Sequence, residues 1–375
     1  MTDWTRERNS AESRPDSDTP QSLRVIEPAG LPSSHDYDSL MRKPGTFVGN
    51  HVSAAPGPSL GEVLARGERS FSFELFPPKT DDGERALWQT IRDLEGLNPT
   101  LISVTYGAGG STRDRTVRIV AGIAAEPDLT PLAHLTCVGA SRDEVRAVIE
   151  EYAAAGVRAI LALRGDPPGG PGTPWAQHPD GLAHADDLVE LIASMGGFSV
   201  GVAAFPEGHP ESPDLDADAA ILARKQDAGA EFAITQFFFD ARDYERLVSD
   251  AGRHGCTMPI LPGLLPVTNV AQIERFAALS GAAFPAELAA RFALVKDDPD
   301  AVQALGVEVA AELGQELLDL GAPGLHFYTL NRSTSTQEVF QALGLGSADE
   351  RRDDLCAHPN EGQPASRVGG TTDEI

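Results

Sequence analysis

Short runs of apolar residues, many of them β-branched or aromatic, recur along the chain between about positions 70 and 345. Most follow one another at roughly thirty-residue intervals and are typical of buried strands. The stretches between them carry apolar residues three and four positions apart, the spacing of one helix face. The eight runs span 71–77, 101–106, 131–137, 159–164, 198–206, 232–239, 258–266 and 324–330.

Two of the intervening stretches predict helices with clear ends. The segment 82–97 has helical apolar spacing and a glycine near its end. The segment 141–156 begins with Ser141 and has Glu144 three positions later, which is the pattern of a capping box, and it stops at a glycine. Further helices are predicted over 185–196, 218–229, 241–255 and 269–281.

Strands that alternate with helices predict parallel βα units, and eight of them favour a (β/α)8 TIM barrel. An open doubly wound sheet is the alternative, which is disfavoured because no GxGxxG loop follows the first run. We place the barrel in residues 59–346. Residues 1–58 and 347–375 are rich in polar residues and lack apolar periodicity, so we predict a disordered extension and tail.

Composition narrows the class of partner. The net charge of −26 disfavours binding to nucleic acids or anionic membranes, since both need clustered cations. The 3 cysteines are too scattered for a disulfide framework, and no motif suggests a metal site. The start of the chain lacks the apolar core of a signal peptide, and no run is long enough to span a membrane. A cytoplasmic protein is therefore expected.

Polar residues gather where the predicted strands end, which is where TIM barrels place their sites. In the first run, FSFELFPP, strand alternation sends Phe71 and Phe73 to one side and Ser72 and Glu74 to the other. An apolar setting disfavours the charged carboxylate, which suits a general acid. Comparable groups near other strand ends are Thr105, Tyr106, His134, Arg164, Asp166, His209, Gln236, Tyr328 and Arg332.

A ligand with both anionic and flat parts would match the remaining candidates. Arg164, His209 and Lys225 are cations or potential cations that could meet the phosphates of a dinucleotide. Flat apolar surface for stacking is offered by Phe205, Phe237, Phe276 and Tyr328. From the residues alone, the chain reads as a barrel enzyme that uses acid catalysis on a planar, partly anionic ligand.

The motifs together resemble the 5,10-methylenetetrahydrofolate reductases. They occur in the expected order across residues 70–345 and read SFELFPPKT, ISVTYGAGGSTRDRT, HLTC, ALRGDPP, AAFPEGHPES, KQDAGAEFAITQFFFD, ILPGLLPV and HFYTLNR. The resemblance implies a TIM barrel, consistent with the strand count. It also implies a flavoenzyme in which NADH or NADPH passes a hydride to FAD and leaves. The folate then takes the hydride in a ping-pong reaction, and the product supplies methyl groups for methionine synthesis.

The resemblance assigns roles to individual residues. Glu74 takes the place of the acid that protonates N10 of the folate, and Asp166 lies between flavin and folate. Folate or nicotinamide contacts carried over are Gln236, Gln272, Phe276, Tyr328 and Arg332. FAD contacts carried over are Thr105, Tyr106, Ala108, His134, Arg164, Gly165, Asp166, Ala185, Phe205, His209, Asp218, Arg224 and Lys225.

Two positions depart from the family pattern and several questions stay open. Phe205 stands where a tyrosine is common, and Ile221 where some members offer a polar FAD contact. Another flavin barrel oxidoreductase, such as a proline dehydrogenase relative, and a non-catalytic folate or flavin binder are the alternatives. The choice between NADH and NADPH is open. Family members are commonly homo-oligomers, and no domain that senses S-adenosylmethionine is expected here.

Overall fold

The computed structural model of the chain describes residues 58–67, 69–106, 110–167, 173–271, 273–274 and 283–345. Apart from Pro58, the predicted N-terminal extension lies outside the described residues, as does the predicted C-terminal tail. So does most of the helix predicted from position 269.

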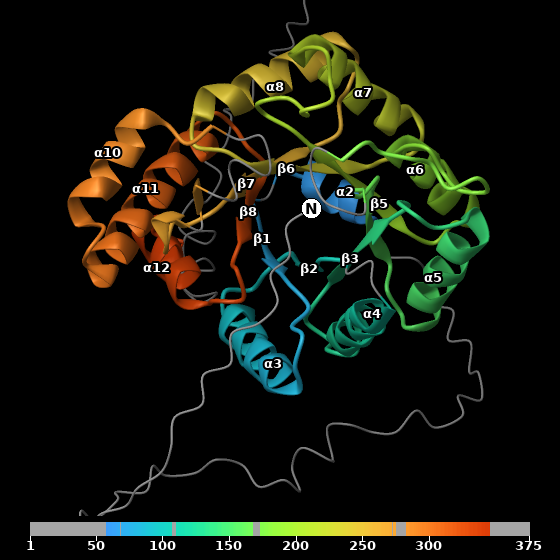
Figure 1. The fold of residues 1–375 in the computed structure, drawn as a ribbon, viewed down its shortest axis with the longest axis horizontal. Coiled ribbons are helices and arrows are strands. Elements are labelled where there is room, and N and C mark those ends of the chain that lie inside the picture. The colour runs from blue at the N-terminus through green and yellow to red at the C-terminus, as the bar shows by residue number, and fades with distance from the viewer. Residues whose placement is uncertain are drawn as a thin grey trace, which may run out of the picture. The chain divides into compact units, whose positions relative to one another are not determined.

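Eight parallel strands close into a barrel in sequence order, with β1 hydrogen-bonded to both β2 and β8 (Figure 1). The predicted (β/α)8 fold is therefore confirmed. All eight predicted strands extend past the observed carboxyl end, because pairing stops where the loops that carry polar residues begin. The strands are β1 Ser70–Leu75, β2 Leu101–Val104, β3 Pro131–Thr136, β4 Ala159–Leu163, β5 Ser199–Ala204, β6 Phe232–Phe237, β7 Ile260–Leu264 and β8 Gly324–Tyr328.

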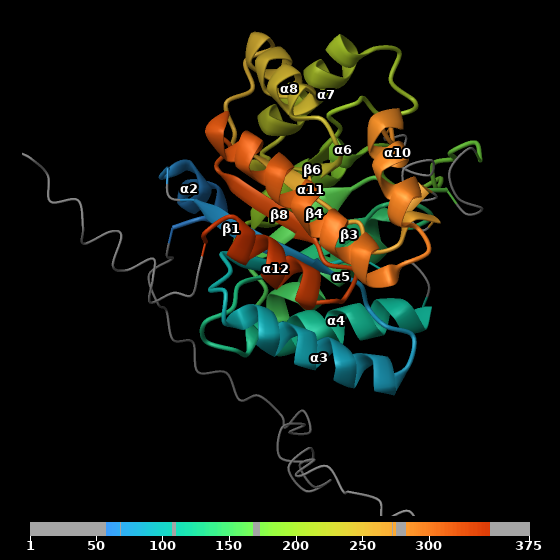
Figure 2. The ribbon, with the colours of Figure 1, turned by 90° about the vertical axis from the view of Figure 1, so that its left-hand side faces the viewer.

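The described helices other than α2 form the outer layer. Those predicted after strands 1, 3, 4, 5 and 6 are observed as α3 Asp81–Glu95, α5 Arg142–Ala154, α6 Ala185–Met195, α7 Leu215–Asp227 and α8 Ala241–Arg253. The pattern did not predict α2 Leu60–Ala65, α4 Gly110–Ala124, α10 Ala286–Val295, α11 Pro299–Asp319 and α12 Thr334–Ala342. Of these, α11 and α12 pack against each other, and α11 also packs against β8 (Figure 2).

Helix ends follow the sequence signals closely at α5. Ser141 accepts a hydrogen bond from the Glu144 backbone, and the Glu144 carboxylate accepts one from the Ser141 backbone, so the predicted capping box is confirmed. No described helix is both long and apolar enough to pass through a bilayer.

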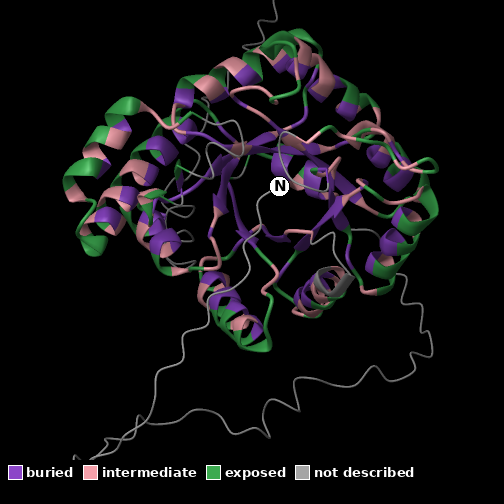
Figure 3. Cartoon of the chain, in the orientation of Figure 1, coloured by how far each residue is buried: buried purple, intermediate pink, exposed green. Residues whose placement is uncertain are grey.

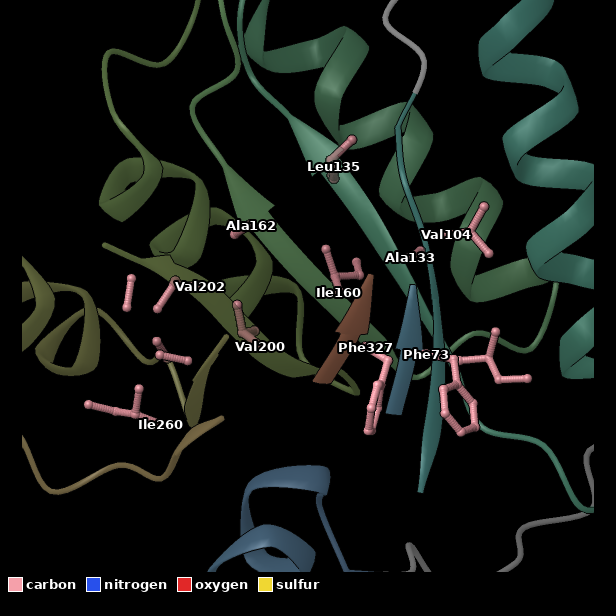
Figure 4. Packing of buried hydrophobic residues seen from close by; sticks show 14 of the residues in the cluster. Phe73, Val104, Ala133, Leu135, Ile160, Ala162, Val200, Val202, Ile260 and Phe327 are labelled. Atoms are coloured by element: carbon pink, nitrogen blue, oxygen red, sulfur yellow. The ribbon is translucent and has the colours of Figure 1, made fainter. Parts of the chain in front are cut away.

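The strands of the barrel are almost wholly buried (Figure 3). Their outer face packs apolar side chains against the helices (Figure 4). On β1 and β8, Phe73 and Phe327 have ring centroids 5.8 Å apart, and both pack on Phe340 of α12. Their complete burial contributes roughly 2–3 kcal/mol each to the free energy of unfolding. The outward-facing residues of each strand therefore hold the barrel to the helix layer.

The inner face is divided into two levels. Near the amino ends of the strands it is apolar, and Leu60 and Leu64 of α2 join that layer. The α2 backbone is tied down where Gly61 N donates to Ser199 Oγ and to Glu231 Oε2. This packing fills the lower barrel, so polar chemistry is confined to the carboxyl ends of the strands.

Candidate active site

Glu74 lies inside the barrel, as strand alternation predicts. Its Oε2 atom is 3.4 Å from His326 Nε2 on β8 and 3.6 Å from His134 Nε2 on β3. Because β1 and β3 are not neighbours in the sheet, the contact with His134 must pass through the barrel interior. Glu74 is only 5% exposed, so its carboxyl group sits in a nearly dry setting between two imidazoles.

The polar layer around Glu74 contains buried polar atoms that make no hydrogen bond in the described part of the chain. Within the described residues, neither Ser103 Oγ nor His134 Nε2 has a hydrogen-bond partner. Burial lowers the pKa of His134, although the nearby Glu74 acts in the opposite direction. His134 is therefore neutral near pH 7. Orphaned polar atoms of this kind are costly unless a ligand completes their hydrogen bonds.

Tyr328 forms a wall of the same layer. Its hydroxyl donates to Thr235 O at 2.8 Å, and its ring packs against Gly263, where a Cβ atom would lie 2.6 Å from the ring. The ring also meets His326 edge to face at 5.4 Å. Burial raises the pKa of Tyr328 well above its usual value, so it stays a neutral donor.

A second cluster stands at the end of β4. Arg164 forms a two-pronged ion pair with Glu211, at 2.6 and 2.8 Å, and this carboxylate raises the pKa of Arg164. The guanidinium lies 5.3 Å from the centre of the Trp175 ring. Gly165 has φ +86°, and a Cβ there would come within 2.6 Å of Val138, so the backbone itself requires glycine. The exposed Asp166 follows directly.

Phe205 and His209 follow β5 and pack edge to face with ring centroids 4.9 Å apart. Burial lowers the pKa of His209, and the positive Arg164 lowers it further. His209 is therefore a neutral imidazole at the same rim as the Arg164 cluster.

Lys225 is a buried cation on α7. Its Nζ donates to Ala203 O at 2.8 Å, and burial lowers its pKa to about 8, although Asp218 favours the charged form. A small cavity beside it is lined by Ala203, Ala204, Phe205, Asp218, Leu222, Lys225 and Leu247. An ammonium group has three donors, and within the described part of the chain Ala203 O accepts one of them, so Lys225 is suited to an anionic ligand.

The other predicted contacts are spread around the carboxyl end of the barrel. Ala185 begins α6, Arg224 is an exposed residue of α7, and Gln236 near the end of β6 accepts from the Phe237 backbone. Thr105 and Tyr106 follow β2 and are half-buried, whereas Arg332 is exposed after β8. Ala108, Gln272 and Phe276 lie outside the described residues. Among the described residues, no cluster of three or more His, Cys, Asp or Glu could hold a metal ion.

Sequence reasoning did not identify three residues of these clusters. His326 belongs to the Glu74 layer, together with Ser72, which strand alternation had placed on the Glu74 face, and Glu211 and Trp175 belong to the Arg164 cluster. Alternation along β8 could have placed His326 on the inner face, since it is two positions before Tyr328. Nothing local in the sequence links Glu211 or Trp175 to Arg164.

Asn331 joins the loops that follow β1 and β8. Its Oδ1 accepts from Phe76 N and its Nδ2 donates to Phe76 O, both at 2.8 Å. It also adopts φ +59°, next to Leu330 at +50°, a region that asparagine tolerates better than most residues. The side chain thus continues the β1–β8 pairing beyond the strands and fixes the loop after Glu74.

Asn331→Ala is expected to lower the free energy of unfolding by about 2–3 kcal/mol, through two lost hydrogen bonds and a strained backbone. Asn331→Gly is the matched control, because it loses the same bonds but relieves the backbone. Urea unfolding of both variants separates the two costs. A change below ~0.5 kcal/mol in the alanine variant would show that the side-chain bonds to Phe76 do not hold the loop.

These observations define the class of protein as a closed (β/α)8 barrel that holds a buried carboxyl group between two histidines. Residues 59–344 match the family model for methylenetetrahydrofolate reductase. The chain belongs to this family and is an oxidoreductase of one-carbon folate metabolism.

Several relatives support the assignment. The 5,10-methylenetetrahydrofolate reductase of Escherichia coli K12 is 41% identical over 287 residues, which cover 76% of this chain and 94% of that protein. The Arabidopsis thaliana methylenetetrahydrofolate reductase (NADH) 1 is 37% identical over 294 residues, covering 76% of this chain and 50% of that protein. A Clostridium thermocellum structure described as binding two copies of 5-methyl-5,6,7,8-tetrahydrofolic acid aligns with a TM-score of 0.53. It is 16% identical and covers 76% of this chain and 97% of that one, so it supports the fold alone.

Proposed function

We propose that the chain reduces 5,10-methylenetetrahydrofolate to 5-methyltetrahydrofolate with NADH or NADPH in a ping-pong reaction through FAD. The observation that carries this proposal is the carboxyl group of Glu74, buried inside the barrel and touched by imidazoles from two other strands. A general acid held away from water is what the folate half-reaction needs. The reaction belongs in the cytoplasm and supplies methyl groups for methionine synthesis.

Glu74 acts on the folate as the proton donor. The methylene bridge of the substrate is closed into a ring and accepts a hydride poorly. Transfer of the Glu74 proton to N10 breaks the N10–methylene bond and leaves an iminium at N5, which is a good hydride acceptor. Because Glu74 is almost fully buried, water does not compete for its proton.

The chain's own residues fit FAD at the carboxyl ends of β3 to β5. Three cations are available for the phosphates of FAD. They are the buried Lys225, the partly buried Arg164 and the exposed Arg224. His134 and His209 are neutral imidazoles that can donate or accept a hydrogen bond without bringing a charge into the pocket. When bound, FAD supplies the group that accepts a hydride from the nicotinamide and later donates it to the folate.

The remaining residues orient the substrates. We assign Asp166 to hydrogen bonding with the flavin and the pterin, because it is exposed at the strand end where both would meet. Gln236 on β6, Gln272, Phe276, Tyr328 and Arg332 would hold the folate or the nicotinamide. Since the two substrates use this site in turn, neither needs a second pocket. The active form is proposed to be a homo-oligomer.

The purified protein is expected to be yellow, or to become so with added FAD. Under anaerobic stopped-flow conditions, NADH or NADPH should bleach the flavin, and methylenetetrahydrofolate should restore its absorbance. Running the two nicotinamides in parallel identifies the donor. Colourless protein that cannot be loaded with FAD, or a reduced flavin that the folate does not reoxidise, would contradict the proposal.

A further inference from the structure

The contacts of Glu74 continue into a chain of buried side chains. His326 is fully buried, with Nδ1 2.7 Å from Ser72 Oγ and Nε2 3.4 Å from Glu74 Oε2. Ser72 is fully buried too and lies on the inner face of β1, two residues before Glu74. The order Ser72–His326–Glu74 therefore runs from β1 to β8 and back to β1.

The distances around Ser72 indicate which nitrogen of His326 carries the hydrogen. The hydroxyl of Ser72 has one hydrogen and two neighbouring acceptors, His326 Nδ1 at 2.7 Å and Leu325 O at 3.5 Å. The nearer acceptor gives much the stronger bond. If Ser72 donates to Nδ1, the neutral imidazole carries its hydrogen on Nε2, which faces Glu74.

The two oxygens of Glu74 are not equivalent. Both histidines approach Oε2, whereas Oε1 makes no hydrogen bond within the described part of the chain. A donor fixed on Oε2 holds the carboxyl plane and leaves Oε1 to face a ligand. The separation of 3.4 Å between Nε2 and Oε2 is long, as catalytic hydrogen bonds often are before the ligand binds.

We propose that His326 is a positioning residue for the acid, and that Ser72 selects the tautomer that lets it act. The Nε2–H group of His326 donates to Glu74 Oε2, and this bond orients the proton on Glu74 Oε1 toward the folate. When that proton moves, the Oε1–H bond breaks and the N10–H bond forms, and the negative charge left on Glu74 is met by the Nε2–H donor. His326 keeps its own proton throughout. This inference rests on the proposed role of Glu74.

The test uses two replacements of His326 that differ in which nitrogen they mimic. His326→Gln can place an amide N–H near the Nε2 position, whereas His326→Asn reaches only the Nδ1 position. Ser72→Ala leaves the imidazole of His326 in place but removes the hydroxyl that selects which ring nitrogen carries the hydrogen. The surface residue His254, which pairs with Asp216 at the end of α8, supplies matched controls as His254→Gln and His254→Asn.

Each holoprotein is compared in the two half-reactions by stopped flow. We expect His326→Asn to slow flavin reoxidation by the folate by roughly 10- to 100-fold, the loss expected when a hydrogen bond to a charged group is removed. His326→Gln should stay within about fivefold of the parent, and Ser72→Ala should fall between them. Flavin reduction by the nicotinamide and the FAD spectrum should be unchanged in all of them, as in the His254 controls.

Equal rates in His326→Asn and His326→Gln would overturn the proposal, because space filling would then be the only role of the side chain. Equal losses in both half-reactions would overturn it as well. If His326→Asn does not fold, parent-like folate rates in Ser72→Ala would overturn the tautomer assignment. A Glu74→Gln variant that still reduces folate would instead refute the proposed role of Glu74, whatever the His326 variants do.

Discussion

Glu74→Gln is expected to slow the folate half-reaction by roughly 10²- to 10⁴-fold, the contribution typical of a positioned general acid. Flavin reduction by NADH or NADPH should stay within about twofold of the parent, since that step needs no proton from this side chain. Glutamine has nearly the same shape, and its carbonyl oxygen can still accept from His326. The loss therefore reports the missing acidic proton rather than a disturbed barrel. Anaerobic stopped-flow traces of the two half-reactions measure it directly.

Glu84→Gln provides the matched control for this substitution. Glu84 is also a buried glutamate, but it lies on α3 and pairs with Arg115 and Arg118 of α4. Breaking that ion pairing should lower the free energy of unfolding, but it should not slow one half-reaction more than the other. If Glu74→Gln slows both half-reactions equally, as a purely structural change would, Glu74 is not the acid.

The face of the strand to which the Glu74 side chain points could be predicted, because it depends on one strand alone. Alternation along residues 71–75 is a local property, and the barrel fold then decides which face is enclosed. The count of eight strands likewise follows from local patterns. The helix α4 was missed because its glycine-rich start resembles a loop, and its amphipathic face emerges only after Gly110.

The partners of Glu74 depend on long-range register and could not be predicted in the same way. His326 reaches Glu74 because β8 pairs with β1, which sets His326 level with Ser72 and Tyr328 level with Glu74. In sequence, 252 positions separate His326 from Glu74. The same holds for Arg164 and Glu211, which meet because the loops after β4 and β5 approach each other. Such contacts depend on how strands and loops distant in sequence are paired in the barrel, which no local pattern encodes.

Burial of the Lys225 ammonium, which we propose binds the FAD phosphates, has a cost in stability while no ligand is bound. In the folded chain its pKa is about 8, whereas an exposed lysine titrates near 10.5. Below pH 8 both states are protonated, and the folded state carries the full cost of the buried charge. Between pH 8 and 10.5 the unfolded state binds more protons, so the stability of the FAD-free protein rises with pH. A bound phosphate would offset this cost by favouring the ammonium form.

Lys225→Met is therefore expected to stabilise the FAD-free protein by up to about 3 kcal/mol at pH 7, with a gain of only about 1.4 kcal/mol at pH 9.5. The same change should weaken FAD binding by roughly 100-fold at pH 7, because a charge-assisted bond is lost. In the parent, FAD affinity should fall by up to about tenfold per pH unit above 8, and the variant should lose this dependence. Urea unfolding and flavin fluorescence titration measure the two effects, with the exposed Lys296→Met as control. A variant that is less stable without FAD, or that binds FAD like the parent, would show that Lys225 is a packing residue and does not hold the cofactor.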